Sequence, residues 1–198
     1  MTKYFMILLV CILVACGASP KPNDQAVTVW TYNENAVLDR LVSDQIKIEQ
    51  KRGTPKQVAN CLKRRDEFVR VAKMTEQSTE LLVALATVES GGCKRLKNEL
   101  GAEGIMQIHF PGTKHLTRAA ALLGVEVDQL DYKHNSTHNL VLGAVRLQDY
   151  TYRYDGNVAD GLEAYNQGPD KVERGPGAHS EFPKYVVRVL ATAQLVNN

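Results

Sequence analysis

The 198-residue chain has little net charge, with 24 lysines and arginines against 22 aspartates and glutamates and a formal net charge of +2. So small a balance gives no basis for binding nucleic acid, which needs concentrated positive charge. Internal repeats and low-complexity tracts are also lacking, which argues against a repeat protein. The longest apolar run, residues 4–14, is too short for a confident membrane-spanning helix.

Metal-binding patterns are scarce as well. The four cysteines show no pairing with histidine at the spacing of a zinc site. His134 and His138 are spaced for one face of a helix, but residues 135–137 read as a loop. We therefore predict no metal site and no cofactor.

The N-terminal segment has the pattern of a secretory signal peptide. Lys3 supplies a positive charge, residues 4–14 form an apolar region, and small residues follow at positions 15–19. We therefore expect residues 1–15 to be a signal peptide. Residues 16–35 begin with prolines and polar residues, so we expect a tether between the membrane and the folded part.

Residues 81–108 carry the strongest chemical signal. Residues 81–88 are apolar on every face, which is typical of a buried helix, and Gly91-Gly92 predict its end. Glu89 then stands in the last turn, where the helix dipole and apolar surroundings both raise the pKa of a carboxyl. A carboxyl that stays protonated near neutral pH can act as a general acid. The alternative is a glutamate that faces water after the helix ends.

The remaining apolar periodicity predicts further helices. An amphipathic helix is expected at residues 36–51, and a single long helix at 54–74, opened by a capping box of Thr54 and Gln57 with Pro55 at the first position. Further helices are predicted at residues 117–123, 139–152, 158–165 and 183–196. The fold class is therefore mainly α, with at most a small hairpin around residues 101–108.

Three motifs follow one another along the chain. Glu89-Ser90 ends the apolar helix, residues 101–107 read GAEGIMQ, and residues 164–169 read AYNQGP. Together they resemble the soluble lytic transglycosylase family, lysozyme-like enzymes that cleave the glycan strands of peptidoglycan. The resemblance covers residues 64–198 and implies a single lysozyme-like domain of the goose-type lysozyme class. Residues 36–63 would then be a helical extension preceding this catalytic domain.

The resemblance implies one catalytic carboxyl. Glu89 would protonate the leaving oxygen and then act as base, while the C6 hydroxyl of the substrate attacks C1 to form a 1,6-anhydro-N-acetylmuramic acid end. Ser90 would contact the glycan or its peptide, or simply cap the helix. Gln107 would bind sugar or the acid, and Met106 would line the cleft or pack in the core.

The same resemblance assigns roles to later residues. Tyr165 would orient Glu89 or hold the acetamido group, unless it is only a buried tyrosine. Asn166 would support the cleft wall. Glu181, which with Tyr185-Val186 resembles the closing motif of the family, would bind sugar or peptide. Glu103 and Glu163 are expected to be solvated, and Gln167 replaces a small residue of the family pattern.

The cysteines bear on location. Residues 13–16 read LVAC, which resembles the bacterial lipobox, so Cys16 would become the lipidated first residue and anchor the protein to a membrane. Cys11 leaves with the signal peptide, so Cys61 and Cys93 remain as an even pair in an oxidising compartment, and we predict that they form a disulfide worth roughly 3–4 kcal/mol. The alternative is two buried free thiols.

Three functions remain in competition. The first is a lytic transglycosylase that acts on peptidoglycan as a lipid-anchored protein of the bacterial cell envelope, facing the periplasm. The second is a hydrolytic muramidase of the same fold, in which water attacks instead. The third is a non-catalytic glycan-binding lipoprotein that works with envelope assembly partners, against which the retained acid counts.

Overall fold

The computed structural model describes residues 36–94, 97–172 and 182–197. Apart from two isolated bridges, Lys97 with Glu103 and Glu103 with Ile108, the regular structure in these ranges is helical, as expected from the sequence. The elements are α1 (Ala36–Lys51), α2 (Thr54–Leu62), α3 (Arg65–Met74), α4 (Thr79–Ser90), α5 (Thr113–Leu123), η1 (Val127–Gln129), α6 (Ser136–Arg153), α7 (Val158–Gln167), η2 (Pro169–Lys171) and α8 (Lys184–Leu195). The proposed signal peptide, tether, Cys16 and Glu181 lie outside the described residues.

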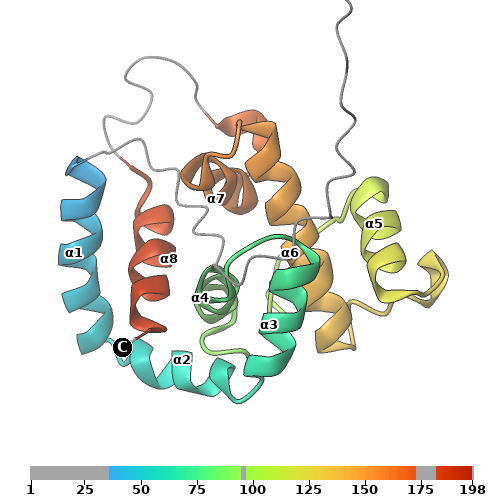
Figure 1. Cartoon of the computed structure of the whole chain (residues 1–198), viewed down its shortest axis with the longest axis horizontal. Coiled ribbons are helices and arrows are strands. Elements are labelled where there is room, and N and C mark those ends of the chain that lie inside the picture. The colour runs from blue at the N-terminus through green and yellow to red at the C-terminus, as the bar shows by residue number, and fades with distance from the viewer. Residues whose placement is uncertain (1–35, 95–96, 173–181, 198) are drawn as a thin grey trace, which may run out of the picture.

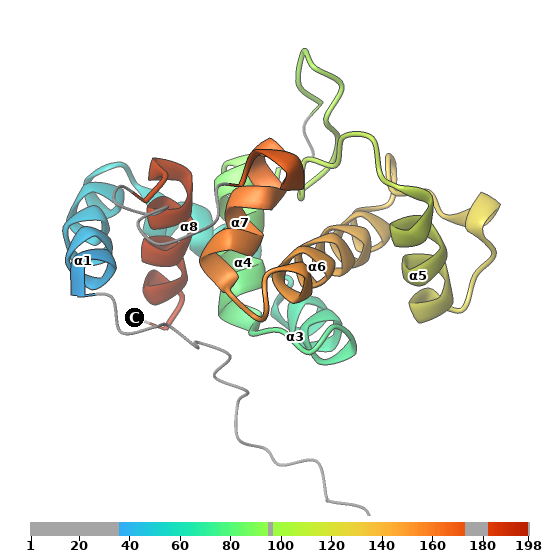
Figure 2. The ribbon, with the colours of Figure 1, turned by 90° about the horizontal axis from the view of Figure 1, so that it is seen from above.

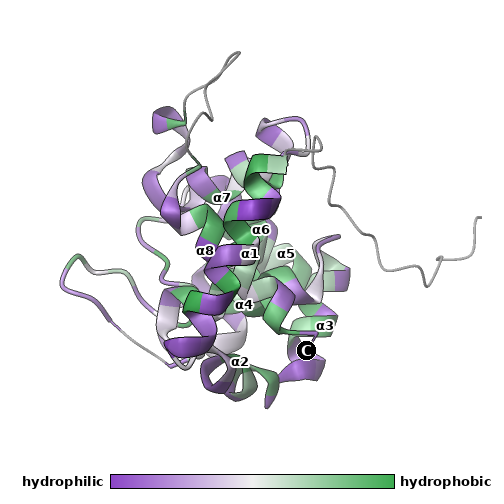
Figure 3. Ribbon diagram, turned by 90° about the vertical axis from the view of Figure 1, so that its left-hand side faces the viewer, coloured by the Kyte–Doolittle hydropathy of each residue, from purple (hydrophilic) through white to green (hydrophobic). Residues whose placement is uncertain are grey.

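Helix α4 is the central element of the fold. It packs against α2, α3 and α8, and every residue from position 81 to 87 is buried (Figure 1; Figure 3). Its start is capped by Ser78, whose Oγ accepts a hydrogen bond from the Leu81 amide. Gly91 adopts the left-handed conformation, with φ of 63°, directly after its last residue. The buried, glycine-terminated helix predicted from the sequence is therefore confirmed.

A second group of helices surrounds α6. This helix packs against α7, α5 and α3, and Figure 2 shows it extending from the region of α4 and α7 toward α5. Asn135 caps its start by accepting hydrogen bonds from the amides of Thr137 and His138. Because of this cap, residues 136 and 137 are helical, so the expectation of a loop there is wrong.

The prediction of one long helix over residues 54–74 is also wrong. The chain bends at Lys63-Arg64, so that α2 packs against α4 and α8 whereas α3 packs against α4 and α6. One straight helix could not reach both sets of neighbours. The capping box fails as well, because Gly53 occupies the cap position and the Thr54 hydroxyl donates instead to the carboxylate of Glu49 at 2.6 Å.

The first two helices belong to the same core as the rest of the described chain. Helix α1 lies along α8, and its buried residues Leu38 and Val42 join one hydrophobic cluster with Val58 of α2 and the residues of α4 (Figure 1). The boundary between an extension and a catalytic domain at residue 64 remains a prediction. None of the described helices is long and apolar enough to cross a membrane.

The predicted disulfide is present. Cys61 near the end of α2 is bonded to Cys93, three residues after the end of α4, with a Cα–Cα distance of 5.1 Å. The Asn60 side chain donates a hydrogen bond to the carbonyl of Gly92 at the same junction. The bridge therefore fixes the C-terminal end of α4, where Glu89 stands.

Candidate active site

The half-buried Glu89 lies in the last turn of α4, as the sequence predicts. The Tyr185 hydroxyl, from the first turn of α8, donates a hydrogen bond to its Oε1 atom. Two guanidinium groups, of Arg146 on α6 and Arg188 on α8, lie near enough to attract its carboxylate form. Three helices thus meet at this carboxyl.

Burial dominates the electrostatics of Glu89. Removal from water raises the pKa of its carboxyl to about 7, while the hydrogen bond from Tyr185 and the attraction of Arg146 and Arg188 oppose the rise. The direction agrees with the prediction from the apolar helix. A carboxyl with this pKa exists in comparable protonated and ionised fractions at neutral pH, as an acid that must also serve as a base requires.

The loop of residues 103–108 is held in place by Asn139 of α6. This side chain is fully buried; its Oδ1 accepts a hydrogen bond from the Met106 amide at 2.8 Å, and its Nδ2 donates to the carbonyls of Glu103 and Tyr132 at 2.9 and 3.0 Å. At Gly104, with φ of 81°, a Cβ atom would lie 2.3 Å from the Asn139 side chain. Only glycine fits this close approach.

Met106 and Tyr165 build the inner side of this loop. Met106 is fully buried against Gly143, where an added Cβ would lie 2.6 Å from the methionine, which supports the core-packing alternative. The buried Tyr165 hydroxyl donates to the Met106 carbonyl at 2.8 Å. The tyrosine that hydrogen-bonds Glu89 is thus Tyr185, whereas the hydrogen bond of Tyr165 supports the loop.

Three other predicted residues have different surroundings. Gln107 is partly buried, has a positive φ of 45°, and donates from Nε2 to the Gly104 carbonyl at 2.9 Å. Ser90 is fully buried and donates from Oγ to the Ala86 carbonyl at 2.6 Å, which supports its helix-end alternative. Asn166 is exposed near the end of α7.

The two acids expected to be solvated are not. Glu103 is partly buried and forms an ion pair with Lys97 at 3.3 Å. Glu163 is buried, and its Oε1 accepts a hydrogen bond from the Gln167 amide at 2.5 Å. Gln167, the residue that departs from the family pattern, therefore secures a buried carboxyl one turn earlier on the same helix.

Sequence reasoning missed Arg146 altogether. Its guanidinium lies over the rings of Tyr150 and Tyr165, 5.5 and 5.3 Å from their centroids, and donates to the His109 carbonyl at 3.1 Å. No motif marks it, since an arginine on an amphipathic helix ordinarily faces water. Tyr185 did carry a signal, because Tyr185-Val186 resembles the closing motif of the family, but that motif does not show that its hydroxyl reaches Glu89.

Within the described ranges, no group of three or more His, Cys, Asp and Glu side chains is placed to hold a metal ion. His134 and His138, whose spacing suits one face of a helix, both interact with Asp131. His134 Nδ1 lies 2.9 Å from its carboxylate, and His138 Nδ1 accepts its backbone N–H at 3.1 Å.

The chain resembles known proteins in sequence and in fold. The transglycosylase SLT domain model matches residues 67–187. The chain is similar in structure to an inactive glutamate-to-glutamine mutant of the lytic transglycosylase Slt from Pseudomonas aeruginosa, with a TM-score of 0.54 and 23% identity. It is also similar to the 70 kDa soluble lytic transglycosylase Slt70 from Escherichia coli, with a TM-score of 0.51 and 25% identity.

Each of these matches covers 67% of this chain, but only 23% and 24% of the two solved chains, which are much longer. The similarity confirms the lysozyme-like fold that the motifs implied. Because the domain model matches more than half of the sequence, the chain belongs to the transglycosylase SLT domain family.

Proposed function

We propose that the protein is a peptidoglycan lytic transglycosylase in which Glu89 is the catalytic acid and base. The observation that carries this proposal is the half-buried carboxyl at the end of α4, whose pKa burial raises to about 7. Membership of the SLT domain family supports a glycan-cleaving activity. The similar Slt protein is described as inactive after a glutamate-to-glutamine change, which agrees with a catalytic glutamate in this fold.

The reaction needs two proton transfers at one group. Protonated Glu89 donates its proton to the oxygen that links N-acetylmuramic acid to N-acetylglucosamine, and the C1–O bond breaks with oxocarbenium character. The carboxylate then accepts the proton of the C6 hydroxyl of the same muramic acid, whose oxygen bonds to C1. Glu89 recovers its proton, no water is consumed, and the product has a 1,6-anhydro end.

The surroundings of Glu89 suit both halves of this cycle. Burial favours the protonated form that must donate first. Once the proton has left, the Tyr185 hydroxyl and the two arginines stabilise the carboxylate. The anion is therefore neither too unstable to form nor too weak a base to take the next proton.

A second carboxylate would favour hydrolysis. Among the described residues, two charged side chains shift the pKa of Glu89, and both are arginines, Arg146 and Arg188. Neither Glu103 nor Glu163 contributes to the shift. Most glycosidases use two carboxyl groups, one of which activates water or attacks directly. This environment supports intramolecular attack by the C6 hydroxyl, with hydrolytic muramidase activity as the alternative outcome.

Substrate contacts are proposed for the residues around the loop. Gln107 and the exposed Asn166 would contact sugar directly. Ser90, Met106 and Tyr165 are buried, so they would act by shaping the wall of the site rather than by reaching the glycan. Glu181 is proposed to bind sugar or peptide on the strength of the family resemblance alone.

We place the protein in the bacterial cell envelope, facing the periplasm, where its peptidoglycan substrate lies. Lipidation of Cys16, proposed from the LVAC sequence, would hold it to a membrane and close to envelope assembly partners. Membrane fractionation of the wild type and Cys16→Ser tests this. Normal processing and equal membrane binding of the variant would disprove the anchor.

The proposed reaction is tested by digesting purified peptidoglycan with the wild type, Glu89→Gln and the control Glu103→Gln. Mass spectrometry should find anhydro-muropeptides, lighter by one water than hydrolysis products, for the wild type and the control. Glu89→Gln should fold and lose at least about 10²–10⁴-fold in rate, since it lacks acid and base catalysis. Reducible ends would assign a muramidase, and an inactive wild type would favour a glycan-binding protein.

A further inference from the structure

Helix α1 carries a second buried glutamate, outside the matched residues 67–187. Glu49 is 0% exposed, yet its carboxylate is well supplied with donors. Gln45 and Arg52 donate to Oε1 at 2.7 and 3.1 Å, and the Thr54 hydroxyl donates to Oε2 at 2.6 Å. These bonds and nearby arginines outweigh burial and lower the pKa of Glu49, which is therefore ionised at neutral pH.

The fourth donor to Glu49 comes from the active-site side of the molecule. Arg188 Nε lies 3.4 Å from Oε2 of Glu49 and joins α8 to α1, which lie side by side in Figure 1. Arg188 follows Tyr185 by three residues, so the two side chains lie on one face of α8. Tyr185 hydrogen-bonds Glu89, and the charge of Arg188 also acts on Glu89. The arginine thus interacts with two carboxyl groups, with Glu49 through a hydrogen bond and with Glu89 through its charge.

We propose that Glu49 is a positioning residue for the reaction, which holds the Arg188 guanidinium toward α1 and so limits its attraction to the Glu89 carboxylate. This inference rests on the proposed role of Glu89 as acid and base. It gives α1, which the family match does not include, a part in setting the active site. Neither Glu49 nor Arg188 touches the substrate in this scheme.

The sign of the effect follows from the charges. An arginine paired with a carboxylate exerts a weaker field than an unpaired one, so loss of the Glu49 charge should favour ionised Glu89 and lower its pKa. Loss of the Arg188 charge should do the opposite. Of the other groups that act on Glu89, Tyr185 of α8 and Tyr165 of α7 have pKa values raised by burial and so stay neutral in this pH range, and Arg146 of α6 is the second arginine whose charge attracts the carboxylate.

The experiment is the pH dependence of kcat/KM for wild type, Glu49→Gln and Arg188→Met. Activity should fall at high pH as Glu89 loses its proton, which defines an alkaline limb near its pKa of about 7. The limb should move down by about 0.5–1 pH unit in Glu49→Gln and up by a similar amount in Arg188→Met. A merely structural pair would lower activity in both variants without moving the limb in opposite directions.

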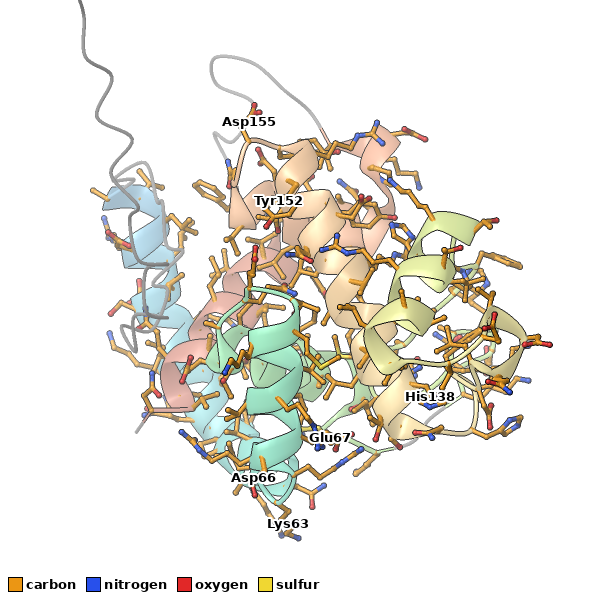
Figure 4. All side chains as sticks on the ribbon, turned by 45° about the vertical axis from the view of Figure 1, so that its right-hand side comes forward. Lys63, Asp66, Glu67, His138, Tyr152 and Asp155 are labelled. Atoms are coloured by element: carbon orange, nitrogen blue, oxygen red, sulfur yellow. A yellow bond between two sulfur atoms is a disulfide. The ribbon has the colours of Figure 1, made fainter. Side chains whose placement is uncertain are left out.

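A matched control exists on α3. Glu67 also forms an ion pair, with Arg64 at 2.6 Å, and accepts a hydrogen bond from Thr137 at 2.5 Å. Figure 4 labels it at the α3–α6 side of the molecule, away from α1. Glu67→Gln should therefore leave the alkaline limb in place. A shift equal to that of Glu49→Gln would overturn the inference.

A direct titration separates this inference from the proposed function. Carbon-13 NMR of the Glu89 carboxyl, assigned with Glu89→Gln, reads the pKa without substrate. Unchanged pKa values in Glu49→Gln and Arg188→Met would overturn the inference even if cleavage depends on Glu89. Full cleavage by Glu89→Gln would instead reject the proposed function. If Glu49→Gln does not fold, Glu49→Asp replaces it, because the shorter side chain draws the carboxylate back from Arg188. The pKa of Glu89 should then be lower in Glu49→Asp than in the wild type. An unchanged pKa would overturn the inference.

Discussion

Glu49 and Glu89 stand near the C-terminal ends of two different helices and behave in opposite ways. Each lies in the last turn, of α1 and α4 respectively, where the negative end of the helix dipole disfavours an anion. Glu49 is fully buried and Glu89 half-buried. Yet the pKa of Glu49 is lowered, whereas the pKa of Glu89 is raised to about 7.

The difference lies in the donors each carboxyl receives. Glu49 accepts hydrogen bonds from four side chains, two of them arginines, and remains an anion that ties α1 to α8 and to the start of α2. Glu89 has the hydrogen bond of Tyr185 and two arginines acting through space. Burial alone therefore does not set the charge of a carboxyl; the supply of hydrogen-bond donors decides whether it stays an anion or holds its proton near neutral pH.

The largest expected effect is the loss of stability in Glu49→Ala, which removes the buried anion from this comparison. Removal of the carboxylate leaves Thr54 and Arg188 without their buried acceptor, so the free energy of unfolding should fall by about 3–5 kcal/mol. Urea denaturation followed by circular dichroism measures it. Asp44→Ala is the control on the same helix, because its ion pair with Lys47 is exposed and should matter by no more than about 0.5 kcal/mol. Equal losses in the two variants would contradict the assigned role of Glu49.

A second prediction concerns the pH dependence of stability. Below about pH 4.5 Glu89 is protonated in both the folded and the unfolded protein. Between about pH 4.5 and 7 it is ionised in the unfolded protein but still protonated in the folded one. The free energy of unfolding should therefore decrease as pH rises across this window, by about 3 kcal/mol in total. Glu49 contributes in the opposite direction, with stability present at neutral pH and lost as pH falls through its lowered pKa.

Denaturation of the wild type and Glu89→Gln between about pH 4 and 8 isolates the contribution of Glu89. The difference between their free energies of unfolding should change with pH over this window with the slope expected for one proton. The reason is that the folded wild type holds one proton that its unfolded chain has released. Curves that run parallel would show that Glu89 has an ordinary pKa, and the proposed acid would lose its physical basis.

The sequence sufficed for features that depend on neighbours along the chain. An apolar run closed by two glycines predicted α4 and the position of Glu89, and the motifs predicted the fold. It failed where packing between distant segments decides. No local sequence signal at Lys63-Arg64 predicts the bend between α2 and α3. The hydroxyl of Thr54 hydrogen-bonds Glu49 of α1 instead of capping its own helix.

In the candidate active site, too, the sequence does not predict contacts that depend on packing between distant helices. The choice between Tyr165 and Tyr185 as the partner of Glu89 depends on how α7 and α8 pack, which no local pattern encodes. One overlooked signal did exist for Glu49: it follows Leu38 by 11 and Val42 by seven residues, on the same helical face as these two buried residues. A charged residue on an apolar stripe predicts a buried ion pair.

The smallest expected effect separates the two tyrosines. Tyr185→Phe removes the donor that stabilises the Glu89 carboxylate, so the pKa of Glu89 should rise and the alkaline limb of kcat/KM should move up by about 0.5–1 pH unit. Tyr165→Phe removes a bond to the Met106 carbonyl instead. It should cost about 1 kcal/mol in unfolding free energy and leave the limb unmoved. If Tyr165→Phe moved the limb and Tyr185→Phe did not, the sequence-based choice of Tyr165 as the residue that orients the acid would be restored, because only a group acting on the Glu89 carboxyl can change where it titrates.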